Sequence, residues 1–265
     1  MLFLLFPSFH SPALAGSGGP DSHGISYVDS EEPSGPPFSV LDLSGGFQLS
    51  FGADSFTEVE LPFEWLWYGE YHGSITVSKD GAVFFGELLE EPLKSCPGDG
   101  GAWSGIAAYW DEWSGAEVRW GEFGAYPDRV FALEWSGAHA VAGGHGTVQL
   151  WLTEGGGYRP EAVIVLDDIE FGDPAADGGA GAVIGLQHTT EGTGVAWSCI
   201  GGLSGSSAAW FGREGFRVSA PERRSDDLDA PWTGNDNHQY IGRSMAVGSV
   251  DGDVYGDLLI GNQDS

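Results

Sequence analysis

The 265-residue chain carries 39 acidic residues against 10 lysines and arginines, a formal net charge of −29 at pH 7. Charge of this sign and size repels phosphate backbones and anionic headgroups, which excludes nucleic acids and anionic membranes as partners. Because 41% of the residues are hydrophobic, the chain can bury a core, and its 44 glycines, which follow no collagen-like period, suit many short strands joined by turns.

The N-terminus reads MLFLLFPSFHSPALA over residues 1–15, an apolar stretch that ends in the cleavage pattern Ala13-Leu14-Ala15. This pattern predicts a signal peptide and a secreted or surface-displayed product. The stretch lacks Lys and Arg, so a misplaced start or a truncated signal stays open as an alternative. No apolar run reaches the roughly 18 residues of a membrane helix. Residues 16–37 are rich in Gly, Ser, Pro and acidic residues, and they predict a flexible leader.

From residue 38 onward, short strand-like runs recur, and no long amphipathic helix intervenes. Many short strands with Gly-rich turns are typical of an antiparallel sandwich or barrel. The predicted fold class is therefore all-β, with an antiparallel β-sandwich-like main domain over residues 38–218. The predicted strands are 47–51, 56–63, 74–78, 82–85, 105–110, 116–120, 129–135, 147–153, 162–166, 182–187 and 194–199.

Two of these runs predict a hairpin. Apolar and small polar residues alternate over residues 74–78, and Lys79-Asp80-Gly81 offers a tight turn before the apolar run 82–85. Asp-Gly between two such runs favours a hairpin because Gly tolerates a positive φ. We expect residues 61–135 to belong to one β core without a catalytic cleft.

The run 147–153 also predicts which side chains face inward. Val148, Leu150 and Leu152 share one face, while Gln149 and Trp151 share the other. The apolar set is expected in the core.

Sequence landmarks in the same region occur in a recognisable order. They are Leu61-Pro62-Phe63, Tyr68-Gly69, VSKDG at 77–81, Phe85-Gly86 and IAAYWD at 106–111, followed by the segments 131–135, 148–152 and 182–186. In this order they resemble the nidogen-like (NIDO) domain, a β-rich extracellular module of matrix proteins and of many secreted bacterial proteins. The resemblance covers roughly residues 38–218 and implies an adhesion-type role outside the cell.

Cys96 and Cys199 are the two cysteines of the chain. In an oxidising compartment, an even pair within one domain predicts one disulfide, and the alternative is two unpaired buried thiols. Neither a CxxC motif nor a Cys/His metal spacing is present.

Two tryptophan pairs allow two interpretations. Trp65 with Trp67, and Trp110 with Trp113, would suit sugar-stacking platforms. In a β-sandwich with eleven tryptophans, packing between the sheets is the favoured interpretation.

Signatures of enzymes are missing from the sequence. There is no HExxH and no GxSxG, and His139 and His145 lack a usual metal-ligand spacing. The carboxylate neighbours Asp167-Asp168 and Asp111-Glu112 would point to opposite faces of a strand. The seven histidines are scattered along the chain at positions 10, 23, 72, 139, 145, 188 and 238. These features predict that the protein is not an enzyme.

Residues 219–234 change composition to Pro and mixed charge, which predicts a linker. Residues 235–265 follow, with Ile241-Gly242, AVG at 246–248, DGD at 251–253 and GDLLIG at 256–261. They resemble one FG-GAP repeat, the propeller-blade unit of integrin α chains and of many bacterial surface proteins. A single blade does not bury both of its faces. The chain is therefore either a fragment of a longer product, or this hairpin packs on the main domain.

The FG-GAP resemblance implies a calcium loop. Its ligands would be Ser249, Asp251, Asp253, the carbonyl of Tyr255 and Asp257. Ser249 stands where the family usually has Asp, which lowers the expected affinity. An EF-hand is excluded because no Glu stands at loop position 12 after Asp251. The alternative is an acidic turn that only solvates a hairpin.

Together these patterns predict a secreted or cell-surface adhesion-type binding protein with an extracellular protein or glycan partner and a calcium-binding repeat. The alternative is a carbohydrate-binding module of a secreted hydrolase.

Overall fold

The computed structural model describes residues 16–33, 35–52, 55–86, 88, 90, 92–155, 160–189 and 193–213, and the backbone of the strands at 240–248 and 257–263. In these ranges every strand pairing is antiparallel, and the one helical element is the 3-10 turn η1 (Asp177–Gly179). The strands are β1 (Ser17–Gly18), β2 (Ile25–Asp29), β3 (Phe47–Gln48), β4 (Phe56–Trp67), β5 (Glu70–Ser78), β6 (Ala82–Phe84), β7 (Gly105–Trp110), β8 (Trp113–Phe123), β9 (Val130–His139), β10 (His145–Thr153), β11 (Ala162–Asp168), β12 (Val183–Gln187), β13 (Gly194–Ser198), β14 (Ser207–Arg213), β15 (Tyr240–Gly248) and β16 (Asp257–Gln263).

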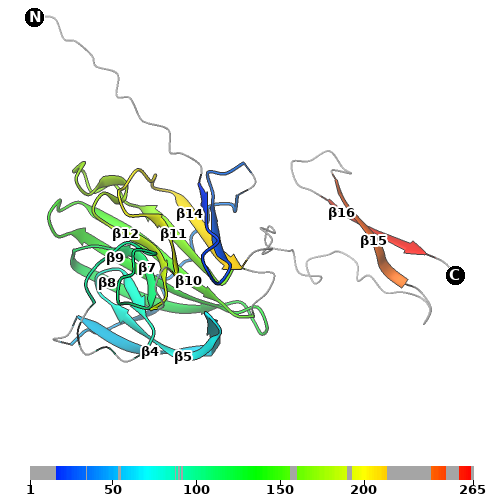
Figure 1. Ribbon diagram of the computed structural model, residues 1–265, viewed down its shortest axis with the longest axis horizontal. Coiled ribbons are helices and arrows are strands. Elements are labelled where there is room, and N and C mark those ends of the chain that lie inside the picture. The colour runs from blue at the N-terminus through cyan, green and yellow to red at the C-terminus, as the bar shows by residue number, and fades with distance from the viewer. Residues whose placement is uncertain are drawn as a thin grey trace, which may run out of the picture. The chain divides into compact units, whose positions relative to one another are not determined.

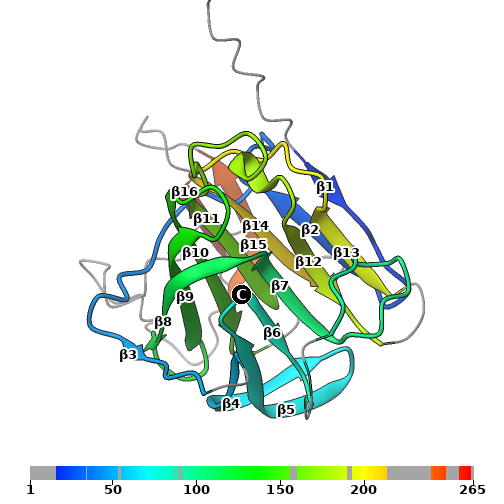
Figure 2. The same ribbon diagram turned by 90° about the vertical axis from the view of Figure 1, so that its left-hand side faces the viewer.

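Strands β1 to β14 form two sheets (Figure 1). The larger has the order β1-β2-β14-β11-β10-β9-β8-β3, and the smaller has the order β13-β12-β7-β6-β5-β4. Figure 2 shows β9, β10 and β11 side by side in the larger sheet and β4 to β7 side by side in the smaller one. The prediction of an all-β, sandwich-like main domain is confirmed.

The chain divides into two units, Met1–Ala220 and Pro221–Ser265. In the second unit, β15 and β16 pair antiparallel, with Val247 opposite Leu258. The propeller-blade form expected for this hairpin stays a prediction.

The inner faces of the two sheets meet in one hydrophobic core. Val148, Leu150 and Leu152 have no exposed surface, as their alternation in β10 predicts. Many buried side chains between Phe63 and Trp135 belong to the same cluster, but Phe84, Trp103 and Trp110 belong to a second one, so the expected single β core holds only for the inner faces.

The predicted hairpin of β5 and β6 is present. Thr76 pairs with Phe84 and Val77 with Val83, around the turn at residues 79–81. Gly81 has φ +88°, and a Cβ on it would meet the carbonyl oxygen of Tyr109 at 2.0 Å. Glycine is therefore required here both for the turn and for the close approach of β7.

A bulge interrupts β4 at the Leu61-Pro62-Phe63 landmark, where the pairing with β5 shifts between Glu60 and Trp65. Arg129 anchors this bulge: its Nη1 donates to the carbonyl oxygen of Pro62 at 2.7 Å, and its guanidinium lies 5.4 Å from the ring centre of Phe63. The same guanidinium donates two hydrogen bonds to the carboxylate of Glu154, from Nε to Oε2 at 2.7 Å and from Nη2 to Oε1 at 2.6 Å. The two-point ion pair joins the ends of β9 and β10 within the larger sheet, and the hydrogen bond to Pro62 ties the edge strand of the smaller sheet to it.

The pair gives a pH-dependent prediction. Hydrogen bonds from Arg129 hold the pKa of Glu154 below its ordinary value. A carboxyl whose pKa is lower in the folded state stabilises the fold above its unfolded pKa of roughly 4.3, and this contribution disappears as the pH falls through the folded pKa. Glu154→Gln should therefore lower the urea midpoint at pH 7, and its difference from wild type should shrink at acid pH.

Glu122 provides the matched control, because its carboxylate lies 3.7 Å from Arg129 Nη1 and is more exposed than that of Glu154. Glu122→Gln should change the midpoint less at every pH. Equal effects of the two variants at pH 7 would show that the two-point pairing has no special role.

The outer face of the larger sheet is also covered, which the alternation in β10 does not predict. Gln149 has no exposed surface. Its Nε2 donates to the carbonyl of Leu41 and to Glu134 Oε2, both at 2.8 Å, and its Oε1 accepts from Leu41 N at 3.1 Å and Trp151 Nε1 at 2.9 Å. The segment around Leu41 therefore crosses this face, and the buried amide is fully hydrogen-bonded.

The predicted flexible leader is wrong for residues 16–30. Strand β2 pairs with β14, β1 pairs with β2, and Ile25 is 1% exposed in the core. Asp29 is buried at 2% exposure and accepts hydrogen bonds from Gly16 N at 3.0 Å and Trp197 Nε1 at 3.2 Å. A segment too polar to fold by itself is ordered here because β14, far along the chain, supplies a pairing edge.

Candidate functional site

The predicted calcium ligands fall almost wholly outside the described residues. Ser249, Asp251, Asp253 and Tyr255 lie outside them, and Asp257 is described only as the first residue of β16. Within the described part of the chain, no group of three or more His, Cys, Asp or Glu side chains is placed to hold a metal ion. The calcium site stays a prediction.

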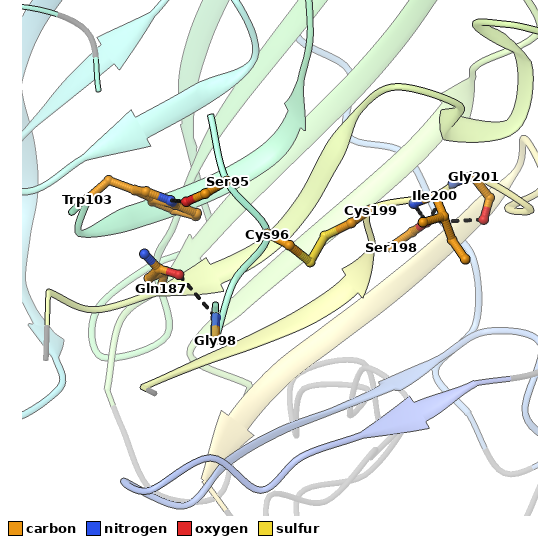
Figure 3. The surroundings of a disulfide bond; sticks show 9 residues. All are labelled: Ser95, Cys96, Gly98, Trp103, Gln187, Ser198, Cys199, Ile200 and Gly201. Carbon is orange, nitrogen blue, oxygen red and sulfur yellow. Dashed lines mark hydrogen bonds between the residues drawn. A yellow bond between two sulfur atoms is a disulfide. The ribbon is translucent and has the colours of Figure 1, made fainter. Parts of the chain in front are cut away.

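The predicted disulfide is confirmed: Cys96 is bonded to Cys199, 103 residues further along (Figure 3). It joins the loop before β7 to the end of β13. Gln187 on β12 holds the same loop, since its Oε1 accepts from Gly98 N at 3.0 Å and its Nε2 donates to the carbonyl of Gly101 at 2.6 Å.

This loop covers the outer face of the smaller sheet. Trp103 is 1% exposed, and its ring meets those of Phe84 and Trp110 edge-on at 6.4 Å and 5.3 Å. Its Nε1 donates to Ser95 Oγ at 3.0 Å, one residue before Cys96 (Figure 3). The disulfide therefore fixes the loop whose tryptophan seals a second apolar cluster.

The two tryptophan pairs are interior, as the packing interpretation predicts. Exposure is 2% for Trp65, 1% for Trp67, 4% for Trp110 and 6% for Trp113. The Nε1 of Trp65 donates to the carbonyl of Glu161 at 3.3 Å, that of Trp67 donates to Ser104 Oγ at 3.3 Å, and that of Trp113 donates to the carbonyl of Tyr109 at 3.2 Å. None of these rings offers a face to a sugar.

Asp111, of the IAAYWD landmark, forms a structural anchor. Its Oδ1 accepts from Lys94 Nζ at 3.0 Å, and its Oδ2 lies 3.3 Å from His139 Nε2. The Nδ1 of His139 accepts from the backbone N–H groups of Val141 and Ala142 at 3.2 and 3.1 Å. We therefore assign the ring proton to Nε2, which donates to Asp111. Both ring nitrogens are used in hydrogen bonds that hold loops, so the imidazole of His139 has no free acceptor for a nucleophile's proton.

Tyr68 occupies the turn between β4 and β5, in the Tyr68-Gly69 landmark. Both residues have positive φ, 45° and 93°, as a two-residue hairpin with this twist requires. The hydroxyl of Tyr68 donates to Asp21 Oδ2 at 2.5 Å. Burial, and next this hydrogen bond, raise the pKa of Tyr68 above the ordinary value of tyrosine. The rings of His23 and His188 lie 5.2 and 5.1 Å from that of Tyr68.

His23 and His188, which are far apart in the sequence, thus lie together beside Tyr68. Asp21 and His23 both come from the segment that was predicted to be a flexible leader. His72 lies on β5, and burial lowers the pKa of its imidazole below the ordinary value. Its Nε2 is buried without a hydrogen-bond partner.

A groove of about 750 Å³ lies along β4 and β5 beside His72. Most of the groove's lining is polar, and the exposed Tyr71 is one of the lining residues. Strand periodicity predicts that such residues are outward-facing, but it does not show which of them line a hollow. The polar lining residues are Thr57, Glu58, Tyr71, His72, Ser74 and Thr76.

No described helix is long and apolar enough to cross a membrane. No curated protein and no solved structure matches the chain. The model of the family described as NIDO related matches residues 32–199, which include β3 to β13 and both cysteines of the disulfide. Because this match spans more than half of the 265 residues and falls on the sandwich, the chain belongs to the NIDO-related family.

Proposed function

We propose that this protein is an adhesion-type binding protein, secreted or held at a cell surface, and not an enzyme. The observation that carries the proposal is the NIDO-related family match over the β-sandwich. A disulfide within the sandwich is compatible with an oxidising, extracellular compartment. In the described domain, pairs such as Asp111–His139 and Arg129–Glu154 hold loops in place, which favours a rigid binding scaffold.

The experiment that tests adhesion uses the full chain without its first 15 residues, coated on beads. Retention of the beads is measured on surfaces carrying purified matrix proteins or glycans, against beads coated with reduced and alkylated protein. The proposal expects retention that needs the native fold. Equal retention of both bead types, or none on any surface, contradicts it.

We further propose that the C-terminal hairpin is an FG-GAP repeat that binds calcium weakly through Ser249, Asp251, Asp253, Tyr255 and Asp257. Three carboxylates within nine residues repel one another in the free loop, and a divalent ion relieves this repulsion. Ser249 removes one formal charge from the ligand set. The expected dissociation constant is therefore on the order of 10⁻⁴ to 10⁻³ M, the range of extracellular calcium modules.

Calcium at millimolar concentration should raise the thermal midpoint of the hairpin's unfolding in the whole protein, relative to chelator at the same ionic strength. Ser249→Asp should enlarge this shift, and Asp253→Ala should abolish it. Magnesium is the control for general screening of the −29 charge. If magnesium acts as strongly as calcium and Asp253→Ala changes nothing, the loop is only an acidic turn.

A carbohydrate-binding module is the second candidate. The tryptophan pairs that suggested it are buried, but the groove beside the exposed ring of Tyr71 offers another place for a sugar.

A further inference from the structure

We propose that the groove along β4 and β5 binds a neutral saccharide, with Tyr71 as the stacking ring. This inference rests on the proposed binding function and names the class of ligand that one site would take. The groove's volume of about 750 Å³ lies within the roughly 300–1,000 Å³ typical of small-molecule sites.

The lining groups match the chemistry of a sugar. Glu58 accepts a hydrogen bond from Ser74 Oγ at 2.7 Å, so a carboxylate and a hydroxyl stand together in the wall. Thr57 adds a hydroxyl that can donate and accept, while the hydroxyl of Thr76 donates to the carbonyl of Gly86 at 3.4 Å and can still accept. Such groups suit the neighbouring hydroxyls of a pyranose ring, which need donors and acceptors at short spacing.

Tyr71 supplies the apolar contact that a sugar's C–H face requires. Its side chain is 70% exposed, whereas the tryptophan pairs of the domain are buried. An exposed aromatic ring beside hydrogen-bonding groups is the arrangement that recognises a ligand with one apolar and one polar face.

Charge selects against acidic glycans. Glu58 lies in the groove wall, and the charges of Glu64 and Glu70 act on the neighbouring His72. Burial favours the uncharged form of His72, so the imidazole offers little attraction to an anion. With −29 net charge on the chain as well, sulfated and sialylated sugars are repelled, and neutral ones are not.

The site is held on paired strands. Glu58 lies opposite Thr76, and Tyr71 lies opposite Leu66, in the register of β4 with β5. The ring of His72 packs 4.8 Å from that of Phe85. Groups fixed in this way lose little conformational entropy when a ligand binds.

The test measures binding of the full chain to immobilised neutral oligosaccharides of glucose, mannose, galactose, xylose and N-acetylglucosamine, with heparin and sialylated oligosaccharides as acidic probes. Titration calorimetry then follows the best probe. Tyr71→Ala should weaken binding roughly tenfold or more, as expected for an aromatic anchor. Tyr126→Ala is the matched control, because Tyr126 is 80% exposed and does not line the groove.

Glu58→Gln should also weaken binding, whereas Glu112→Gln, an exposed carboxylate elsewhere on the domain, should not. The inference is overturned if wild type binds none of the neutral oligosaccharides, if it binds only the acidic ones, or if Tyr71→Ala binds as tightly as Tyr126→Ala. Bead adhesion that survives such a result would leave the proposed function standing, so the two failures are distinguishable.

Discussion

Removing the bond between Cys96 and Cys199 should lower the free energy of unfolding by about 4–5 kcal/mol. The bond closes a loop of 103 residues, and on the chain-entropy model a loop of this length restricts the unfolded chain by that amount. For a domain of this size, the thermal midpoint should fall by about 10 °C. Scanning calorimetry of the protein with and without reductant measures the shift.

Removing the disulfide should also lower stability through lost packing, in addition to the greater entropy of the unfolded chain. The loop that the bond anchors carries Trp103, which packs against Phe84 and Trp110 on the outer face of the smaller sheet. Releasing the loop should expose these rings and move tryptophan emission to longer wavelength before global unfolding. Cys96→Ala/Cys199→Ala is the control, because its midpoint should be low and insensitive to reductant. Alkylation of the native protein without reductant should find no free thiol. A wild-type midpoint that reductant leaves unchanged would refute the prediction.

Trp135→Ala should destabilise the protein by about 3–5 kcal/mol, the usual cost of truncating a large buried aromatic side chain. Trp135 on β9 has no exposed surface, and its Nε1 donates to the carbonyl of Ser78 on β5 at 2.8 Å. It therefore joins the larger sheet to the smaller one by packing and by a hydrogen bond. Trp135→Phe keeps most of the packing and loses the hydrogen bond, so it should cost only about 1–2 kcal/mol.

Urea unfolding followed by far-ultraviolet circular dichroism measures these differences. Trp210→Ala is the matched control, because Trp210 on β14 is only half-buried and packs on the outer face with Val163 and Val165. It should cost clearly less than Trp135→Ala. If Trp210→Ala costs as much, the contact between the sheets is not the main source of stability.

Much of the main domain follows from local pattern. The alternation in residues 74–78 and 147–153 identifies strands and their inner faces because the side-chain period of a strand is two. Asp80-Gly81 marks the β5–β6 turn because few other residues accept its positive φ. Family resemblance in the order of the landmarks is likewise a property of the sequence, and the NIDO-related match confirms it.

Strands β2 and β14 show where local pattern fails. The first lies in a polar, Gly-rich segment, and the second lies near the end of the main domain, where no strand is predicted. Strand β14 lies between β11 and β2 and pairs with both, and β2 forms because it pairs with β14, with Trp210 opposite Val28. Pairing between strands so far apart in the sequence depends on the assembled sheet. A short stretch of neighbouring residues therefore carries no signal that predicts it.

The candidate groove has the same origin. Glu58, Tyr71 and Ser74 look like ordinary outward-facing strand residues, and only the pairing of β4 with β5 brings them to one hollow. The spacing of aromatic residues suggested Trp65 and Trp67 as a sugar-binding pair, but both side chains are buried in the sandwich. Burial depends on what covers a face, and for Gln149 the cover is a segment more than 100 residues away.

By itself, the sequence determined the fold class, most strands and their inner faces, the family and the cysteine pair, because these depend on short periods, turn residues and composition. Only the tertiary structure decided which outward faces are covered, which polar residues are anchors and which line a groove. The physical reason is that covering a surface and closing a hollow require contacts between distant segments, and their free energy appears only when the sheets have assembled.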